Sequence, residues 1–379
     1  MSANRPRRAR IGLRTTAFLL VVAIGAAGLA ERVGDRRPSG PSATGTALPI
    51  GSGPLPATDA AGGTAAALEG AMQGLEVRAA RGAPVRQDLG RAADVALRRT
   101  SHAREAFEAR SVDDPFVADA LAAYTLALAG HGLPGGSYSS KAVELLDSWV
   151  STMRTVGHAC PDSGACQTSL VLSRAAPALV YAADLLVADG RLDAAWQGRF
   201  HDWLREVVLP AASERRNNWG DAGTYLRVVL AVELGDARQL DMGLAMWRKG
   251  IDLVARDGHI PEETRRGAAG LMYTQEALSY KVAVAELASR IGIDLWTTKG
   301  RRGGDLRTAL DLTAAALSGH ARWSWYPGPV RMPDPSPMWV LVDHRWPGVR
   351  SFAALAHRSA ASNGRNHSAI VWTLTWAAS

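Results

Sequence analysis

The sequence predicts an all-α protein, on three observations. Apolar residues recur at helical spacing in one segment after another, clusters of Gly, Pro and Asp separate these segments, and strand-like alternation is nearly absent. Paired helices in a bundle, a solenoid or a toroid fit this pattern, and the lack of a fixed-period repeat counts against a regular solenoid. The chain has 379 residues, 47% of them hydrophobic, which is enough for one sizeable core.

Eight segments have the clearest helical period, and we expect helices over 116–129, 139–155, 169–188, 194–208, 222–234, 237–255, 268–291 and 306–317. The last fifth of the chain differs, because tryptophan and proline crowd a region with little helical period. We expect an irregular segment there that packs on the helical body or lines a groove. Its indoles either cap the core or, at Trp323 and Trp325, stack on sugar rings.

The N-terminus has the pattern of a signal peptide over residues 1–30. Five arginines precede an apolar run from Ala17 to Ala30, which is shorter than the roughly 20 residues that span a bilayer. We therefore expect export to an extracytoplasmic or secreted location, with cleavage near residue 30 and no stable membrane anchor. The adjacent Arg7 and Arg8 leave the general and the twin-arginine routes both open.

Residues 31–65 consist mostly of Pro, Gly, Ser, Thr and Ala, so we expect a disordered linker before a single domain at 66–379. The formal charge of +7 suggests a polyanionic partner. Loss of residues 1–30, which carry five arginines and no acidic residue, leaves only +2. A nucleic-acid partner is therefore not expected, and attraction to a polyanion must come from local placement of Arg and Lys.

The chain has two cysteines, Cys160 and Cys166, close together in a loop-like run. In an oxidising compartment they are expected to form a disulfide that fixes the loop, with free thiols as the alternative. His158 alone is thin support for a metal site. The sequence thus implies no metal and no cofactor, and we expect a monomer.

Two short regions combine polar groups in ways that a core does not require. The first, 215–221, reads Arg-Arg-Asn-Asn-Trp-Gly-Asp before an expected helix. Asn217 and Asn218 are either turn and N-cap residues or polar groups of a functional site. The second, 257–267, leads into a helix with Tyr273 and Tyr280. Steps of seven residues return to nearly the same helix face, so Arg266, Tyr273 and Tyr280 would share a stripe. An Arg and a Tyr facing one groove suit an acidic sugar, while the alternative is a solvated Arg and a core Tyr.

These regions carry a resemblance. The run N-N-W-G at 217–220, the run D-G-H-I-P-E-E-x-R-R-G-x-x-G-L-x-Y at 257–273 and the pieces A-E-x-A and G-I-D-L-W within 285–296 resemble the alginate lyase family of α/α-toroid polysaccharide lyases, over about 113–317. The resemblance implies an incomplete α/α toroid with a groove across its face. It also implies that Asn218 neutralises the uronate carboxylate, that Arg266 binds it, and that Tyr273 transfers the proton.

One position departs from the family pattern, because Trp219 stands where the family has His after Asn-Asn. An indole cannot accept a proton. Either His259 fills this role from a neighbouring loop, or Tyr273 takes both proton transfers. Asn217 and Trp219, at the matching run, and Tyr280, on the stripe shared with Tyr273, are further candidates for contact with the substrate.

The expected function is that of a secreted polysaccharide lyase that cleaves a 4-linked uronic-acid polymer by β-elimination. Its partner is an anionic polysaccharide, and alginate and a related uronan such as glucuronan both remain open. One rival is a glycoside hydrolase that uses Glu262 or Glu263 with Asp221 as paired carboxylates. Another is a glycan-binding envelope protein that has lost the chemistry at Trp219.

Overall fold

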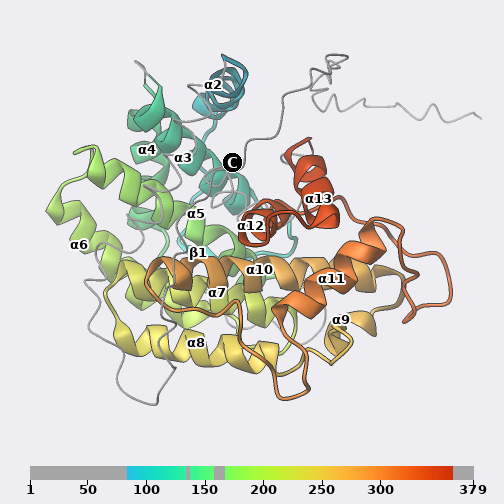
Figure 1. Cartoon of the computed structure of the whole chain (residues 1–379). Helices are drawn as coiled ribbons and strands as arrows, with labels where there is room; N and C mark the ends of the chain where they lie inside the picture. The colour runs from blue at the N-terminus through green and yellow to red at the C-terminus, as the bar shows by residue number, and fades with distance from the viewer. Residues whose placement is uncertain (1–82, 134–136, 158–166, 362–379) are drawn as a thin grey trace, which may run out of the picture. The chain divides into compact units, whose positions relative to one another are not determined.

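A computed structural model describes residues 83–133, 137–157 and 167–361 (Figure 1). The expected signal peptide, the linker and both cysteines lie outside these residues. Nearly all of the regular secondary structure in the described residues is helical. Its helices are α2 (Ala83–Leu97), α3 (Pro115–Gly132), α4 (Tyr138–Thr152), α5 (Thr168–Ala188), α6 (Ala194–Trp203), α7 (Asn218–Glu233), α8 (Ala237–Ile251), α9 (Pro261–Thr264), α10 (Gly270–Arg290), α11 (Leu306–Leu317), α12 (Met338–Arg345) and α13 (Arg350–Ala361).

The remaining regular structure is small. Strands β1 (Ala106–Phe107) and β2 (Thr155–Val156) pair in parallel and form the one sheet of the described residues. A π-helical turn (Leu204–Val208) and a 3₁₀ turn (Leu209–Ala211) extend α6. Another 3₁₀ turn (Gly267–Ala269) precedes α10.

The core lies along four helices, α3, α5, α7 and α10, which pack against one another in this order. Helices α4, α8 and α11 pack on α3, α7 and α10 respectively. The turn of three residues between α7 and α8 makes this pair antiparallel. Helix α5 is long and apolar enough to span a membrane by composition, but 89% of that stretch is buried within the protein. Its apolar character is therefore that of a core helix.

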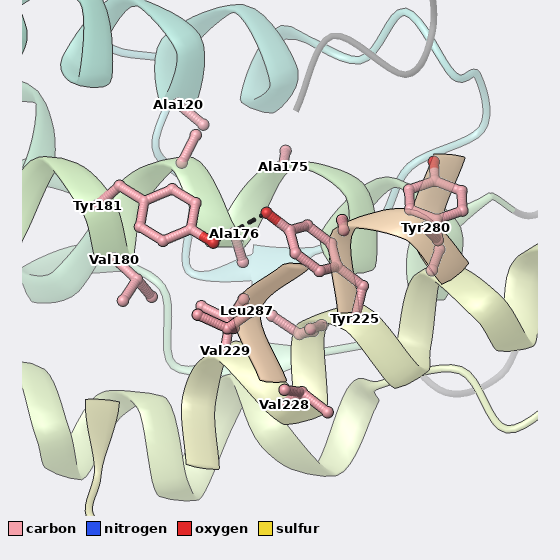
Figure 2. Close-up of a cluster of buried hydrophobic side chains, with 14 of the residues drawn as sticks. Ala120, Ala175, Ala176, Val180, Tyr181, Tyr225, Val228, Val229, Tyr280 and Leu287 are labelled. Carbon is pink, nitrogen blue, oxygen red and sulfur yellow. Dashed lines mark hydrogen bonds between the residues drawn. The ribbon is translucent and has the colours of Figure 1, made fainter. Parts of the chain in front are cut away.

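Tyrosines from all four core helices contact one another in the core, with one each from α3, α5, α7 and α10. The hydroxyl groups of Tyr181 and Tyr225 are hydrogen-bonded at 3.0 Å (Figure 2). The rings of Tyr124 and Tyr181 lie 6.3 Å apart, and so do those of Tyr225 and Tyr280. Burial raises the pKa of Tyr124, Tyr181 and Tyr280 well above the usual value, so these phenols stay neutral and act as core groups.

A buried carboxylate joins the start of the described chain to the core. Asp119 on α3 is fully buried and accepts hydrogen bonds from the Arg99 side chain at 2.6 Å, the His102 backbone N–H at 2.7 Å and the Trp149 indole at 3.1 Å. A buried carboxylate needs such donors, because an unpaired charge away from water is costly. Asp119 therefore fixes the segment before α3 against α3 and α4.

The eight expected helices are all present; α11 has the expected ends, and the other helices differ at one or both ends. Helix α7 begins at Asn218 rather than at 222, because the Asn217 side chain accepts the Trp219 N–H at 3.1 Å and caps it. Helix α8 stops at Ile251 rather than at 255. The segment expected over 194–208 is α-helical only to Trp203.

The expectation of an irregular last fifth is only partly correct. Residues 318–337 lack helix, but α12 and α13 follow them. Most of the prolines of this part precede α12, Pro347 lies between α12 and α13, and Pro337 stands at the N-cap position of α12, where a missing N–H costs nothing. Trp339 is fully buried, and Trp346 packs edge-on against Trp296 with ring centroids 5.3 Å apart, so these indoles belong to the core and its cover.

Candidate active site

The first turn of α7 is held in place by very close backbone contacts. A Cβ atom on Gly220 would lie 1.5 Å from the carbonyl oxygen of Arg215, so only glycine lets the preceding segment cross the helix this closely. Asn217 caps the helix, which confirms the turn interpretation for this residue. Its side-chain oxygen is thereby engaged within the fold, so the expected substrate contact finds no support there.

Asn218 is the first residue of α7 and is 1% exposed. Its backbone N–H donates to Oε1 of Glu263 at 2.7 Å, and its side-chain oxygen accepts from Nη2 of Arg266 at 3.3 Å. The side-chain amide nitrogen of Asn218 has no protein partner. A buried N–H donor without a partner is unfavourable in the free protein, and it is suited to a ligand oxygen.

Glu263 and Arg266 come from the segment around α9. Nε of Arg266 lies 3.1 Å from Oε2 of Glu263, which is completely buried. Burial raises the pKa of Glu263 to about 7, although the Arg266 charge opposes the shift and the nearby Asp221 carboxylate adds to it. Glu263 thus holds both the start of α7 and the guanidinium of Arg266.

Arg266 also lies over the ring of Tyr273, with the guanidinium carbon 4.1 Å from the ring centroid. The two residues lie together as the groove hypothesis requires, but not on a shared helical stripe as expected. Helix α10 begins at Gly270, and Arg266 precedes a separate 3₁₀ turn, so the pair does not share one helical stripe. Tyr273 is half-buried in the first turn of α10, on the side of Arg266.

Two expected contacts with the substrate are wrong. Tyr280 is fully buried and packs in the core beside Tyr225 (Figure 2). The face of α10 that bears Tyr273 is accessible only at the start of the helix. Tyr280, seven residues later on the same face, already lies in the core. Trp323 is 4% exposed and packs edge-on against Trp325 at 4.8 Å. Trp325 itself is only half-buried, so one face remains a candidate for sugar stacking.

His259 lies in a different set of contacts from Asn218 and Tyr273. Its Nδ1 is 2.5 Å from Oδ1 of Asp257, and its ring lies 5.0 Å from that of Trp325. Trp219 is half-buried in the first turn of α7, and the Arg215 guanidinium lies 4.2 Å above its ring. The described contacts therefore join Asn218, Arg266 and Tyr273 into one cluster, hereafter the Arg266 cluster, and leave His259 outside it.

Glu263 was expected only as one possible acid of a hydrolase. Its position three residues before Arg266 is a signal for the pairing seen here, since such spacing brings two side chains together on one helical turn. Asp221, the other carboxylate of that hypothesis, is ion-paired with the buried Lys281. Glu262, the alternative acid, pairs with Arg265, so all three carboxylates of that hypothesis have protein partners, which disfavours the hydrolase. No group of three or more metal-ligating side chains exists within the described ranges.

The fold is that of known polysaccharide lyases. An alginate lyase from Bacteroides ovatus superimposes with a TM-score of 0.61 at 15% identity, covering 82% of this chain and 97% of that one. A variant of alginate lyase A1-III in complex with a tetrasaccharide, an enzyme of Sphingomonas species A1, gives a TM-score of 0.55 at 18% identity, covering 66% of this chain and 78% of that one. The predicted all-α architecture, an α/α toroid, is confirmed.

The sequence profile of the alginate lyase family matches residues 77–323, and the chain belongs to this family. A polysaccharide lyase of Stenotrophomonas maltophilia (strain K279a) is 32% identical over 157 residues, which are 38% of this chain. The match spans only 44% of the length of that relative. The resemblance seen in the sequence is therefore confirmed at the level of the family.

Proposed function

We propose that this protein is a polysaccharide lyase that cleaves a 4-linked uronic-acid polymer, alginate or a related uronan, by β-elimination. The observation that carries the proposal is the Arg266 cluster, in which one guanidinium contacts both the Asn218 amide at 3.3 Å and the Tyr273 ring at 4.1 Å. Membership of the alginate lyase family supports the same class of activity.

The elimination needs the residue types found in the Arg266 cluster. Removal of the proton on C5, next to the carboxylate, builds negative charge on that carboxylate. The unpartnered amide N–H of Asn218 and the Arg266 guanidinium are donors suited to this charge. By stabilising this charge, the two donors make the C5 proton acidic enough for a side-chain base to remove it.

Tyr273 is the proposed proton-transfer residue. In its ionised form the phenol takes the C5 proton, the C4–C5 double bond forms, and the bond between C4 and the glycosidic oxygen breaks. That oxygen then receives a proton from the same phenol, which balances the step. One tyrosine serves both transfers when the proton and the leaving group lie on the same side of the ring. The family histidine is then not needed at Trp219, and the separate contacts of His259 favour this route.

Incubation with a panel of polymers tests the proposal. The panel contains alginate, polymannuronate, polyguluronate, glucuronan and hyaluronan, and the readouts are absorbance of the new double bond and product masses. We expect absorbance to rise with at least one polymer, since only elimination makes an unsaturated uronate. Saturated products would favour a hydrolase, and binding without turnover would favour the glycan-binding alternative.

A further inference from the structure

A second potential binding region lies beside the Arg266 cluster and is not accounted for by the proposed chemistry. A pocket of about 660 Å³ opens between the first turns of α7 and the second half of α8. Neither Asn218, Arg266 nor Tyr273 lines it. Met246 and Leu253 form part of an apolar wall, and charged side chains surround the remainder.

The acidic groups of this pocket are neutralised by neighbours. Asp221 at its base pairs with the buried Lys281. Asp252 pairs with Arg301, whose Nε lies 3.1 Å from its carboxylate. The third acidic residue that lines the pocket, Glu214, has an oxygen 2.9 Å from the guanidinium of Arg227.

Positive charge is left over at the mouth. Arg216 and Lys249 line the pocket, are exposed, and take part in none of the ion pairs of the described residues. Arg215 also lines the pocket, and its guanidinium carbon lies 4.2 Å from the centroid of the Trp219 ring. With its carboxylates already paired, the pocket has an excess of positive charge beside an apolar wall. These features suit a ring that has an apolar face and a carboxylate.

The base of the pocket is formed by tight packing. A Cβ atom on Gly250 would lie 2.6 Å from Nζ of Lys281 and 3.2 Å from Oδ1 of Asp221. Glycine at this position of α8 therefore leaves room for the ion pair under the pocket. Asp221 is also only three residues from Asn218 in α7, so the pocket and the Arg266 cluster flank the same helical turn.

We propose that this pocket binds a carboxylate-bearing sugar at a subsite separate from the Arg266 cluster, with Arg216 and Lys249 contacting the carboxylate and the apolar wall at Met246 and Leu253 contacting the ring. The sugar is either a further residue of the polymer held at the Arg266 cluster or part of a second oligouronate molecule. The identity of this ligand rests on the proposed function.

Two kinds of variant test the subsite without touching the Arg266 cluster. The double variant Arg216→Gln with Lys249→Gln removes the two charges, and Ala245→Trp fills the pocket from an exposed position of α8. Arg191→Gln is the charge control, because Arg191 is exposed in the turn after α5 and lines no part of the pocket. Ala237→Trp is the steric control, since it is exposed on α8 but lies outside the pocket.

Calorimetric titration with an alginate tetrasaccharide, on the full chain carrying Tyr273→Phe to prevent turnover, measures binding directly. Steady-state rates of the otherwise unaltered chain on long polymer and on tetrasaccharide give the second readout. If one chain spans both sites, the pocket variants raise KM for long polymer by about three- to thirtyfold, keep kcat, and leave tetrasaccharide turnover unchanged. If a second molecule binds, saturation needs two tetrasaccharides per protein, and the pocket variants lose one of them.

Unchanged KM, affinity and stoichiometry in both pocket variants would overturn the subsite. Equal effects in the two control variants would overturn it as well, since the change would then not depend on the pocket. Failure of the proposed function is recognised separately. In that case no polymer of the panel yields unsaturated product, while the titration still reports whether the pocket binds a uronate.

Discussion

At the scale of single residues, Tyr273 bears most of the proposed chemistry. Tyr273→Phe removes one oxygen and leaves the ring under Arg266, so the fold should persist with at most about 1 kcal/mol of lost stability. Turnover should fall by roughly 100-fold or more, because the proton-transfer group is gone. The measurement is the initial rate of double-bond formation, with a thermal melt to check folding.

Tyr138→Phe is the matched control for that experiment. Its hydroxyl donates to Asp94 at 2.7 Å on the surface between α2 and α4, away from the Arg266 cluster. The control should keep the wild-type rate. Near-full activity of Tyr273→Phe would show that the assignment of this site is wrong.

Glu263 gives a prediction about pH. Its pKa is raised from 4.5 to about 7 in the folded protein, so the folded state binds more protons than the unfolded state between these values. Stability therefore falls as pH rises through this window, and the cost is fully present above about pH 7. A shift of this size corresponds to roughly 2–4 kcal/mol.

The variant Glu263→Gln isolates this contribution, because an amide of the same shape does not titrate. The fall in urea midpoint between pH 5 and pH 8 should be smaller in the variant than in the wild type. Activity should also fall, since the neutral amide binds the Arg266 guanidinium less strongly. Equal pH dependence in the two proteins would contradict the raised pKa.

At the scale of elements, the glycine in the first turn of α7 determines where Asn218 stands. Gly220→Ala would place a methyl group 1.5 Å from the Arg215 carbonyl oxygen, so the helix start must move. We expect a loss of about 1–3 kcal/mol and a loss of activity greater than the stability change explains. Denaturant unfolding and initial rates measure the two effects.

Gly198→Ala in α6 is the control, because a Cβ atom there meets nothing within 4 Å. This substitution should stabilise the protein by about 0.5–1 kcal/mol, since alanine favours helix more than glycine does. A similar loss in both variants would argue against the close backbone contact as the cause.

The helices themselves were largely predictable from sequence, and the depth of their side chains was not. Periodicity identified α10, but it could not show that Tyr280, on the same face as Tyr273, is buried in the core. Arg266 and Tyr273 were expected on one face of a continuous helix, although a 3₁₀ turn connects them and brings them into contact. Both differences arise from packing between elements, which a single sequence does not encode locally. Helices α12 and α13 were missed because the aromatic and proline crowding before them hid their short apolar periods.

At the scale of the whole molecule, export remains a prediction. The apolar run at 17–30 is too short to remain as a span, so the mature chain should begin near Glu31 and be found outside the cytoplasm. N-terminal sequencing of the exported protein checks it. Recovery of an intact Met1 terminus in the membrane fraction would refute cleavage.

The carboxylate of Asp119 has a consequence for how far the chain can be shortened. Its partners Arg99 and His102 precede the first helix that belongs to the continuous core, α3. A chain trimmed to begin at α3 would keep every core helix. It would lose the Arg99 and His102 donors, so that of the three donors described above only the Trp149 indole would still contact the fully buried Asp119 carboxylate. Loss of the Arg99 guanidinium would leave the negative charge of Asp119 uncompensated in the interior, which is strongly destabilising. We therefore expect the smallest stable fragment to begin at or before Arg99, so the stretch from Arg99 to His102 belongs to the folding unit rather than to a dispensable leader.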